Sequence, residues 1–439
     1  MKSVTAPFLS NYERGGHMQD RAILHCDCNN FFASVELLSR PDLRDRPVAV
    51  TGDPENRHGI ILAKNEIAKR AGVKTAETIW QAKKKCPGLI CLPSHHRLYY
   101  DFSRRINRIY LDYTDLIDPF SVDESFLDIT GSLKMLKKTP AEVADELRSR
   151  VRKEIGITIS VGVSFCKVFA KLGSDYKKPD ATTVITRDNL SSIVYPLPAS
   201  ELLFVGKKTN ELLNRIGIRT IGDIAHADRE DLMRVLGIQG DTLWKYANGL
   251  DDEPVSPYYV KHDPKSVGNG MTFKRDIVGR EEIQIGIGEL SDEVSTRLRA
   301  LNKKGYVVAL QIKTPNFKVI QKQKRLDAPT WLQSRISEVA MELFGSVYAF
   351  TLPVRSLTVT VSDLTQAGSE KHQMNIFDEE ETPQIQKQES IEAAMNDIRQ
   401  KYGHGSIHLG LHEKKEIGIE HRKSDISGDP QNRKNKEKH

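Results

Sequence analysis

The amino-acid sequence predicts a multidomain α+β protein, and three observations point to this fold class. The chain has 439 residues, and because a domain usually holds ~100–200 residues, we expect three or four domains. Apolar strands alternate with amphipathic helices as far as residue 185, and strands and helices alternate again between residues 267 and 361. Between these stretches, residues 199–250 are short segments of helical periodicity separated by glycines. Such changes along a chain indicate separately folded modules.

The first mixed stretch contains the elements that we expect to form a catalytic core. Apolar or alternating runs predict strands at Arg21–Cys26, Pro47–Gly52, Phe120–Ile129 and Thr158–Ser164. Helical spacing of apolar residues predicts helices at Lys64–Ala71, Thr78–Lys85, Arg97–Asp112, Ala141–Glu154 and Lys167–Tyr176, and a further helix that begins at Asn29 or Asn30.

The later elements follow from glycine, proline and charge patterns. Leu202–Ile224 resembles a helix–hairpin–helix, in which a glycine turn presents backbone N–H groups to a DNA phosphate. Asp251–Pro264 is acidic and contains proline, which favours a tether. The module after it is expected to form strand, helix, strand, helix and strand at Val267–Phe273, Ile283–Asn302, Tyr306–Thr314, Pro329–Phe344 and Val354–Val361. Residues 1–19 and 366–439 are expected to be disordered.

Composition excludes some classes of protein and favours others. No apolar run approaches the ~20 residues of a membrane span, and the N-terminus lacks the apolar core of a signal peptide, so we expect a cytoplasmic protein. The five cysteines have no paired zinc spacing and are expected to be small buried side chains.

The basic residues are unevenly distributed. The chain has 65 Lys and Arg against 59 Asp and Glu, a net charge of +6. Between Lys261 and Arg325 there are 14 Lys and Arg against 7 Asp and Glu, a local excess of +7. A solvated face would explain this, but clustering in one module favours a surface that binds phosphate.

Three acidic residues stand where charge is costly. Asp27 follows an apolar strand, and Asp123 and Glu124 lie inside another. One interpretation is an oxygen-ligand site for two Mg²⁺ ions that activate a hydroxyl and neutralise a leaving pyrophosphate. The alternative is structural, with acids that cap or salt-bridge strand ends. Adjacent residues of a strand point to opposite faces, so both acids reach one site only if the chain bends. Spacing alone leaves both interpretations open.

Three longer motifs favour the first interpretation. HCDCNNFFASVE (His25–Glu36), SVDESFLDI (Ser121–Ile129) and SVGVSFCKVFAKLGSDYKKP (Ser160–Pro179) closely resemble three ordered motifs of Y-family DNA polymerases. KSVGNGMTFKRDI (Lys265–Ile277) resembles the start of that family's extra DNA-binding domain, the little finger. The resemblance covers most of the chain. It implies a right-hand polymerase with a palm, small fingers, a helical thumb and a C-terminal α+β little finger.

The resemblance also implies a set of metal ligands. Asp27 and Asp123 match the aspartates that bridge two metal ions, and Glu124 matches the third carboxylate, on the metal that activates the primer 3′-hydroxyl. The backbone carbonyl of Cys28 would complete the nucleotide-side metal. The implied cofactors are two Mg²⁺ ions per active site, for which Mn²⁺ can substitute.

A second implied set binds the nucleotide. Phe32 matches the steric gate, an aromatic ring that leaves no room for a ribose 2′-hydroxyl, although its spacing fits a core aromatic equally well. Lys178 matches a lysine that contacts the triphosphate. The backbone amides of Asn30, Phe31 and Phe32, at the start of a helix, could hold phosphate oxygens.

The sequence departs from the family pattern at several positions. Glu66 and Lys69 stand where a Tyr and an Arg commonly grip the triphosphate; Lys69 supplies charge without a bidentate fork, and Glu66 cannot replace the Tyr. Cys166 stands where an Asn is common, and Asn29 where an acid is common. These departures favour the UmuC-type branch of the family over the polymerase IV branch.

The C-terminal tail contains one short motif. Its residues resemble the Q-x-x-hydrophobic-F peptide with which bacterial polymerases dock on the sliding clamp, and they are Gln373, Met374, Ile376 and Phe377. Five-residue motifs occur by chance, but a position directly after the last domain favours clamp binding. Ile376 and Phe377 would fill an apolar pocket.

The resemblance implies a complete organisation and reaction. The expected domains are a palm at 20–28 and 96–185, fingers at 29–95, a thumb at 186–252, a linker at 253–262, a little finger at 263–365, and a tail at 366–439. A primer 3′-hydroxyl would attack the α-phosphate of a dNTP on primed DNA, with low fidelity past damaged bases and without proofreading. The protein is expected to act as a monomer.

Two rival functions remain at this point. One is a two-metal nuclease that uses the same three acids. The other is a damage-tolerance scaffold without catalysis, which binds DNA and the clamp and which Glu66 and Cys166 would permit.

Overall fold

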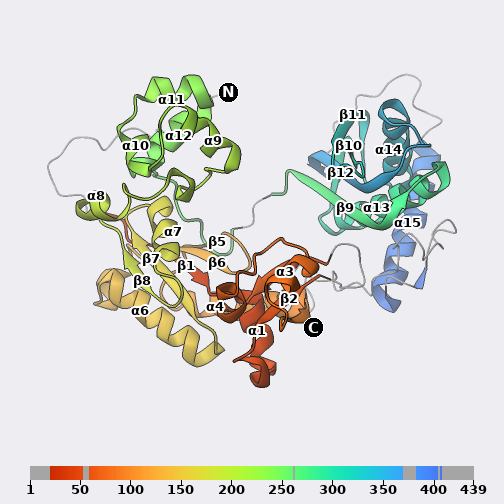
Figure 1. Cartoon of the computed structure of the whole chain (residues 1–439). Helices are drawn as coiled ribbons and strands as arrows, with labels where there is room; N and C mark the ends of the chain where they lie inside the picture. Colours follow the sequence, from red (N-terminus) through yellow and green to blue (C-terminus); the bar gives the residue numbers. More distant parts are fainter. Residues whose placement is uncertain (1–19, 53–58, 261–262, 369–381, 404–405, 408–439) are drawn as a thin grey trace, which may run out of the picture. The chain divides into compact units, whose positions relative to one another are not determined.

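The computed structural model describes residues 20–52, 59–260, 263–368, 382–403 and 406–407. These fall into two compact units, one formed by the described parts of 1–45 and 98–260 and the other by those of 46–97 and 261–439 (Figure 1).

A five-stranded sheet is the centre of the first unit. Its order is β5-β6-β1-β7-β8, in which β1 pairs antiparallel with β6 and β7 while β8 is parallel to β7. All residues of the central strands β1 and β7 are buried. The strands are β1 (Ile23–Cys28), β5 (Ile117–Pro119), β6 (Glu124–Asp128), β7 (Ile159–Ser164) and β8 (Thr182–Val184).

Helices of this unit pack on the sheet or form a separate helical cluster. Those near the sheet are α1 (Phe31–Ser39), α4 (His96–Tyr110), α5 (Leu133–Leu136), α6 (Pro140–Arg150), α7 (Lys167–Tyr176) and α8 (Leu190–Ile193). The cluster consists of α9 (Lys207–Arg215), α10 (Ile221–His226), α11 (Arg229–Leu236) and α12 (Ile238–Ala247), and it shares its apolar core with α7 through Phe165 and Phe169.

A glycine in β7 allows α7 to lie close to the sheet. A Cβ atom on Gly162 of β7 would lie under 3.0 Å from backbone atoms of Ala170, Gly173 and Ser174, so only glycine permits this approach. The close packing fixes the face of α7 that lies over β1 and β7.

The chain that leaves the helical cluster is attached to the sheet of the same unit. Arg21 donates hydrogen bonds to the carbonyl oxygens of Asp251 (2.9 Å) and Glu253 (3.0 Å). Val255 is buried against Ile23, and the backbone N–H of Tyr258 donates to Asp115. The expected tether is therefore held on the first unit at least as far as Tyr258.

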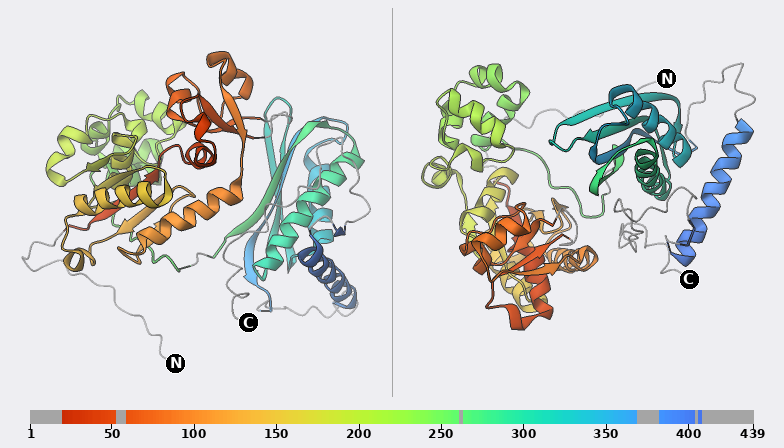
Figure 2. Two further views of the ribbon diagram at one scale, coloured as in Figure 1. Left: turned by 90° about the horizontal axis from the view of Figure 1, so that it is seen from below. Right: turned by 45° about the vertical axis from the view of Figure 1, so that its right-hand side comes forward.

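The second unit contains two sheets. The three-stranded sheet, β3-β2-β4, consists of β2 (Val48–Thr51), β3 (Ile61–Lys64) and β4 (Ile90–Pro93), with α2 (Glu66–Arg70) and α3 (Ile79–Lys85). The four-stranded antiparallel sheet, β11-β10-β12-β9, consists of β9 (Ser266–Ile277), β10 (Lys303–Lys313), β11 (Val319–Thr330) and β12 (Val354–Gln366). Helices α13 (Arg280–Ala300) and α14 (Gln333–Val347) pack on one face of it (Figure 2).

The structure corrects two expectations in this unit. Residues 319–330 form strand β11, which the sequence did not predict, so the helix expected from Pro329 begins only at Gln333. The expectation of disorder throughout 366–439 is wrong for Thr382–Tyr402, which form helix α15. A buried ion pair of Arg399 with Asp292, at 2.8 and 2.9 Å, attaches α15 to α13. The expected disorder of residues 1–19 concerns a segment outside the described residues.

Candidate active site

Strand pairing brings two of the three predicted acids to one edge of the sheet. Asp27 in β1 is the register partner of Glu124, the first residue of β6. Asp27 is 5% exposed, and Glu124 is half-buried. Two carboxylates on facing residues of neighbouring strands repel each other unless cations lie close to them.

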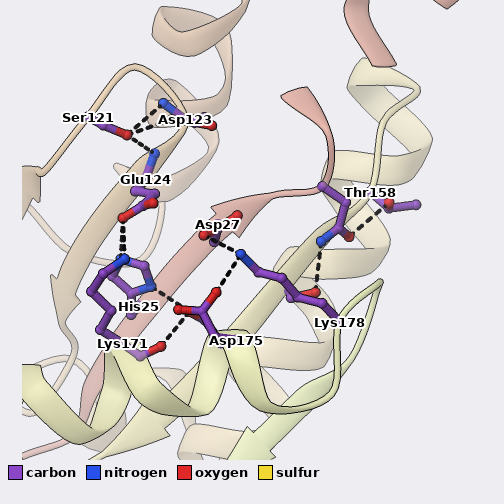
Figure 3. Close-up of polar contacts among 12 residues, drawn as sticks. His25, Asp27, Ser121, Asp123, Glu124, Thr158, Lys171, Asp175 and Lys178 are labelled. Carbon is purple, nitrogen blue, oxygen red and sulfur yellow. Dashed lines mark hydrogen bonds and ion pairs between the residues drawn. The ribbon is translucent and has the colours of Figure 1, made fainter. Parts of the chain in front are cut away.

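A bend brings Asp123 to the same edge. Ser121 Oγ accepts hydrogen bonds from the backbone nitrogens of Asp123 (3.3 Å) and Glu124 (3.1 Å) and donates to Asp123 Oδ1 at 2.6 Å (Figure 3). The Asp123 carbonyl accepts from the backbone N–H of Cys28 at 3.0 Å. Asp123 therefore precedes β6, and strand alternation does not separate it from Glu124. The strand predicted from Phe120 begins later for this reason.

Lys178 neutralises Asp27. Its ammonium group lies 2.6 Å from Asp27 Oδ2 and 2.7 Å from Asp175 Oδ1 (Figure 3). Burial raises the pKa of Asp27 to about 7, although Lys178 opposes this shift. Burial would lower the pKa of Lys178, but the carboxylates of Asp27 and Asp175 outweigh it and raise this pKa.

Glu124 contacts two nitrogen groups. Lys171 Nζ lies 2.6 Å from Glu124 Oε2, and His25 Nε2 lies 3.3 Å from the same oxygen (Figure 3). Burial alone would raise the pKa of Glu124, but the contacts with His25 and Lys171 lower it to about 2. Glu124 is therefore held as a carboxylate at neutral pH.

The hydrogen bonds of His25 define its orientation. The ring is fully buried, and Nδ1 lies 2.8 Å from Ser174 Oγ. The Ser174 hydroxyl also donates to the Lys171 carbonyl at 2.8 Å. Nε2 faces Glu124 Oε2 at 3.3 Å, a contact that falls short of hydrogen-bond geometry. Burial lowers the pKa of His25.

Asn29 fixes the loop that carries Lys178. Its side-chain oxygen accepts from the backbone nitrogen of Asp180 (2.9 Å) and from the hydroxyl of Thr158 (3.0 Å), and its amide donates to Ser160 Oγ (2.9 Å). An ionised carboxylate has no donor, so an acid at this position could keep the last contact only by accepting from the Ser160 hydroxyl. Asn29 therefore makes all three bonds with the Ser160 hydroxyl as an acceptor.

Phe32 stacks on an aromatic ring of α4. The rings of Phe32 and Tyr99 are 4.0 Å apart at an interplanar angle of 13°. Tyr99 is buried and its hydroxyl donates to Glu36 at 2.5 Å. The half-buried Phe32 ring therefore has a fixed support. Phe31, its neighbour, is buried, and Asn30 adopts a left-handed conformation (φ 50°) before α1.

The donor set of this edge fits a divalent cation. Asp27, Asp123 and Glu124 supply carboxylate oxygens, the ligands that Mg²⁺ prefers, and Nε2 of the buried His25 faces the Glu124 carboxylate. Among the residues that the structure describes, no three ligand side chains gather around one point. Each carboxylate instead has a partner within the chain: Lys178 pairs with Asp27, Lys171 with Glu124, and the Ser121 hydroxyl with Asp123.

Other predicted residues are not part of this constellation. Lys69 belongs to α2 of the second unit, where it lies 3.6 Å from Glu66. Cys166 is buried and precedes α7. The clamp motif at Gln373–Phe377 falls outside the described residues.

Sequence reasoning missed three residues of the site, namely His25, Ser174 and Asp175. The spacing of four polar residues follows the helical period, so they lie on one face of α7 and of the segment directly after it. These residues are Lys171, Ser174, Asp175 and Lys178. That face is polar although α7 packs on buried strands, which indicates polar partners on β1.

The fold and the acidic edge define the class of protein. A Y-family DNA polymerase chimera superimposes with a TM-score of 0.70 at 22% identity, over 79% of this chain and 99% of the chimera. This similarity shows a Y-family polymerase fold and confirms the predicted fold class.

Sequence comparison gives the family itself. The impB/mucB/samB family matches residues 26–175, and its C-terminal domain matches residues 264–376. The DNA polymerase IV of Acetivibrio thermocellus is 44% identical over 391 residues, 89% of this chain and 97% of that protein. DNA polymerase IV 1 of Bacillus subtilis is 36% identical over 398 residues, 91% of this chain and 94% of that protein. The chain therefore belongs to the impB/mucB/samB family.

These relatives confirm the family that the three motifs indicated. Because they bear the name DNA polymerase IV, they favour that branch over the UmuC-type branch to which Glu66, Lys69 and Cys166 had pointed. A search of the described helices finds none with both the length and the apolar character needed to cross a membrane.

Proposed function

We propose that the protein is a DNA-directed DNA polymerase that extends primers past damaged template bases with low fidelity and without proofreading. The observation that carries this function is the backbone pairing that places Asp27, Asp123 and Glu124 at the β1–β6 edge, in a chain that matches both domains of the family. Family membership implies dependence on a divalent metal.

The metal ligands would be Asp27, Asp123, Glu124 and the backbone carbonyl of Cys28. Two bound Mg²⁺ ions, for which Mn²⁺ can substitute, would activate the primer 3′-hydroxyl and neutralise charge on the leaving pyrophosphate. His25 and Lys171 keep Glu124 ionised and oriented before any cation arrives. An ionised carboxylate does not have to lose a proton when it binds a cation.

Lys178 would bind the triphosphate of the incoming nucleotide. Its ammonium group already lies at the acidic edge, 2.6 Å from Asp27. A phosphate oxygen can replace Asp27 as its partner, which would release the carboxylate for the metal. The backbone amides of Asn30, Phe31 and Phe32 at the start of α1 would contribute further phosphate contacts. For Lys69, a phosphate contact rests on the resemblance to the family alone.

Phe32 would act as the steric gate against ribonucleotides. Its stack on Tyr99 prevents the ring from yielding to an additional 2′-hydroxyl. Phe32→Ala is expected to raise ribonucleotide incorporation. Tyr99→Leu, which removes the support and keeps the gate, should raise it less. Unchanged sugar discrimination in Phe32→Ala would contradict the assignment.

The four-stranded sheet of the second unit would contact the DNA backbone. Val359 and Val361 of β12 are buried in the core under the helices, so the alternate residues Thr358 and Thr360 lie on the opposite face. There they pair with glycines of β9. A face of small polar residues permits close approach of a phosphate backbone, and the basic excess of residues 261–325 supplies the charge.

Primer extension tests the proposal. Wild-type protein, Asp123→Ala and the exposed control Asp188→Asn are incubated with primed template, Mg²⁺ and dNTPs, with and without a lesion in the template. We expect extension by the wild type and the control and none by Asp123→Ala. Primer shortening without extension would instead indicate the rival nuclease, and the absence of both activities with intact DNA binding would indicate the rival scaffold.

The clamp peptide and the oligomeric state belong to the same proposal. We infer that Gln373, Met374, Ile376 and Phe377 bind the sliding clamp and that the protein acts as a monomer in the cytoplasm. Replacing Ile376 and Phe377 with Ala should weaken clamp binding and leave clamp-free extension unchanged. Loss of both activities would contradict a role limited to the clamp.

A further inference from the structure

An exposed tryptophan projects from the three-stranded sheet module of the second unit. The chain has three tryptophans, all in the part that the structure describes, and Trp80 of α3 is 71% exposed. Trp244 and Trp331 are both half-buried. An indole ring has a large, rigid apolar face on which another planar group can stack.

The local fold keeps Trp80 in the solvent. Thr78 and Gln81 form a capping box that fixes the start of α3. Ala82 faces the core of this module together with Cys86, just after the helix. Two residues correspond to about 200° around a helix, so Trp80 points away from the core that contains Ala82.

Positive charge is concentrated in the segment that contains Trp80. Residues 64–85 contain seven Lys and Arg against two Asp and Glu. Lys84 Nζ lies 5.5 Å from the centroid of the Trp80 ring. Lys83 and Lys84 are exposed in the last turn of α3, whereas Lys85 forms an ion pair with Glu77.

We propose that Trp80, Lys83 and Lys84 form a binding site for single-stranded DNA, in which an unpaired base stacks on the indole ring and the lysines contact the flanking phosphates. The combination of an exposed aromatic face with adjacent lysines is the chemistry by which proteins hold unpaired strands without reading sequence. Bases of a duplex are already stacked on each other, so an intact duplex gains nothing from the indole. The strand is the template ahead of the primer, an identification that rests on the proposed function.

The stacking contact can be measured directly with fluorine NMR. The full chain is labelled with 5-fluorotryptophan, which gives three resonances, and Trp80→Phe identifies the one that belongs to Trp80. A thymidylate oligomer is expected to shift this resonance with the same saturation curve that fluorescence anisotropy of the oligomer gives. A blunt duplex of equal length should not shift it at saturation. A bound oligomer that leaves the resonance in place overturns the proposal.

Substitutions test the energetic role. Trp80→Ala is expected to weaken oligomer binding by about fivefold or more, and Trp80→Phe, which keeps an aromatic face, by less. Lys83→Gln with Lys84→Gln should lower the slope of log affinity against log salt by about 1.4, because each phosphate contact contributes about 0.7 on a single strand. Lys153→Gln, an exposed lysine of the first unit, is the matched control and should leave the affinity within twofold.

If Trp80→Ala and the wild type bind the oligomer with equal affinity and melt at the same temperature, the proposed site is wrong. This result is expected if the surface binds an acidic protein and not DNA. None of these measurements depends on catalysis. If the protein fails to extend primers but the Trp80 resonance still shifts, the polymerase function is contradicted and the proposed binding site is retained.

Discussion

Gly162→Ala should separate α7 from the sheet that carries Asp27. Gly162 lies in β7, and an added Cβ would approach within 3.0 Å of the Ala170 carbonyl oxygen, the Ser174 nitrogen and the Gly173 carbonyl carbon. All three are backbone atoms, which cannot rotate away as a side chain can. The only relief is a movement of α7, which carries Lys171 and Ser174 of the candidate site.

The contacts set the size of the effect. Overpacking of a well-packed core costs ~1–3 kcal/mol, and a clash with three backbone atoms belongs at the upper end, so we expect a loss of about 3 kcal/mol. At ~1.4 kcal/mol for each factor of ten, this is roughly a hundredfold change in the opening equilibrium of β7 and α7.

Hydrogen exchange followed by mass spectrometry is the suitable assay, because a chain of several domains does not unfold in one step. Peptides from Ile159–Tyr176 should exchange about a hundredfold faster in Gly162→Ala, and primer extension should fall with them. Gly131→Ala is the matched control: it lies in the same unit, and its Cβ would meet nothing within 4 Å. If both variants exchange at the wild-type rate, the close approach does not position α7 and the reasoning is refuted.

Three further changes test individual contacts. His25→Phe keeps the ring volume and removes the nitrogen beside Glu124. The Mg²⁺ concentration for half-maximal extension should then rise by about tenfold, and so should the dissociation constant of Mn²⁺ measured by electron paramagnetic resonance. A change in melting temperature alone would indicate a packing role. Asp27→Asn should raise the melting temperature at pH 8 and leave it unchanged at pH 4. The pKa of Asp27 is about 7 in the folded state and ~3.9 in the unfolded chain. The stability that the protonated carboxyl contributes is therefore complete below about pH 4 and is lost as the pH rises through 7. Arg399→Met leaves the Asp292 carboxylate buried without its partner, which should weaken the attachment of α15 by about 3 kcal/mol. Trypsin should then cleave faster within 382–402, while the rest of the unit resists cleavage. Equal cleavage rates in the variant and the wild type would show that other contacts hold α15.

Much of the fold was predictable because its elements carry strong local signals. The helix predicted at Lys167–Tyr176 agrees with α7 at both ends, and the strand at Thr158–Ser164 agrees with β7 to within one residue. Both segments are strongly periodic or continuously apolar. Strand β11 lacked such a signal: its sequence, VIQKQKRLDAPT, is mostly polar because it lies at the edge of its sheet, where few side chains enter the core.

The candidate site, too, was predictable from the sequence only in part. The sequence by itself determined the family and predicted the three acids, because motifs of 9 to 20 residues carry more information than any spacing of single charges. Only the tertiary structure decided what stands beside each acid. Lys178 and Asp27 are 151 positions apart in the chain, and the pairing of β1 with β6 makes Glu124 the register partner of Asp27. Such contacts depend on strand register and on the approach of α7 to β7, both of which arise from packing between distant segments. The polar face of α7 is a local signal in the sequence, but it does not identify its partners on β1 and β6.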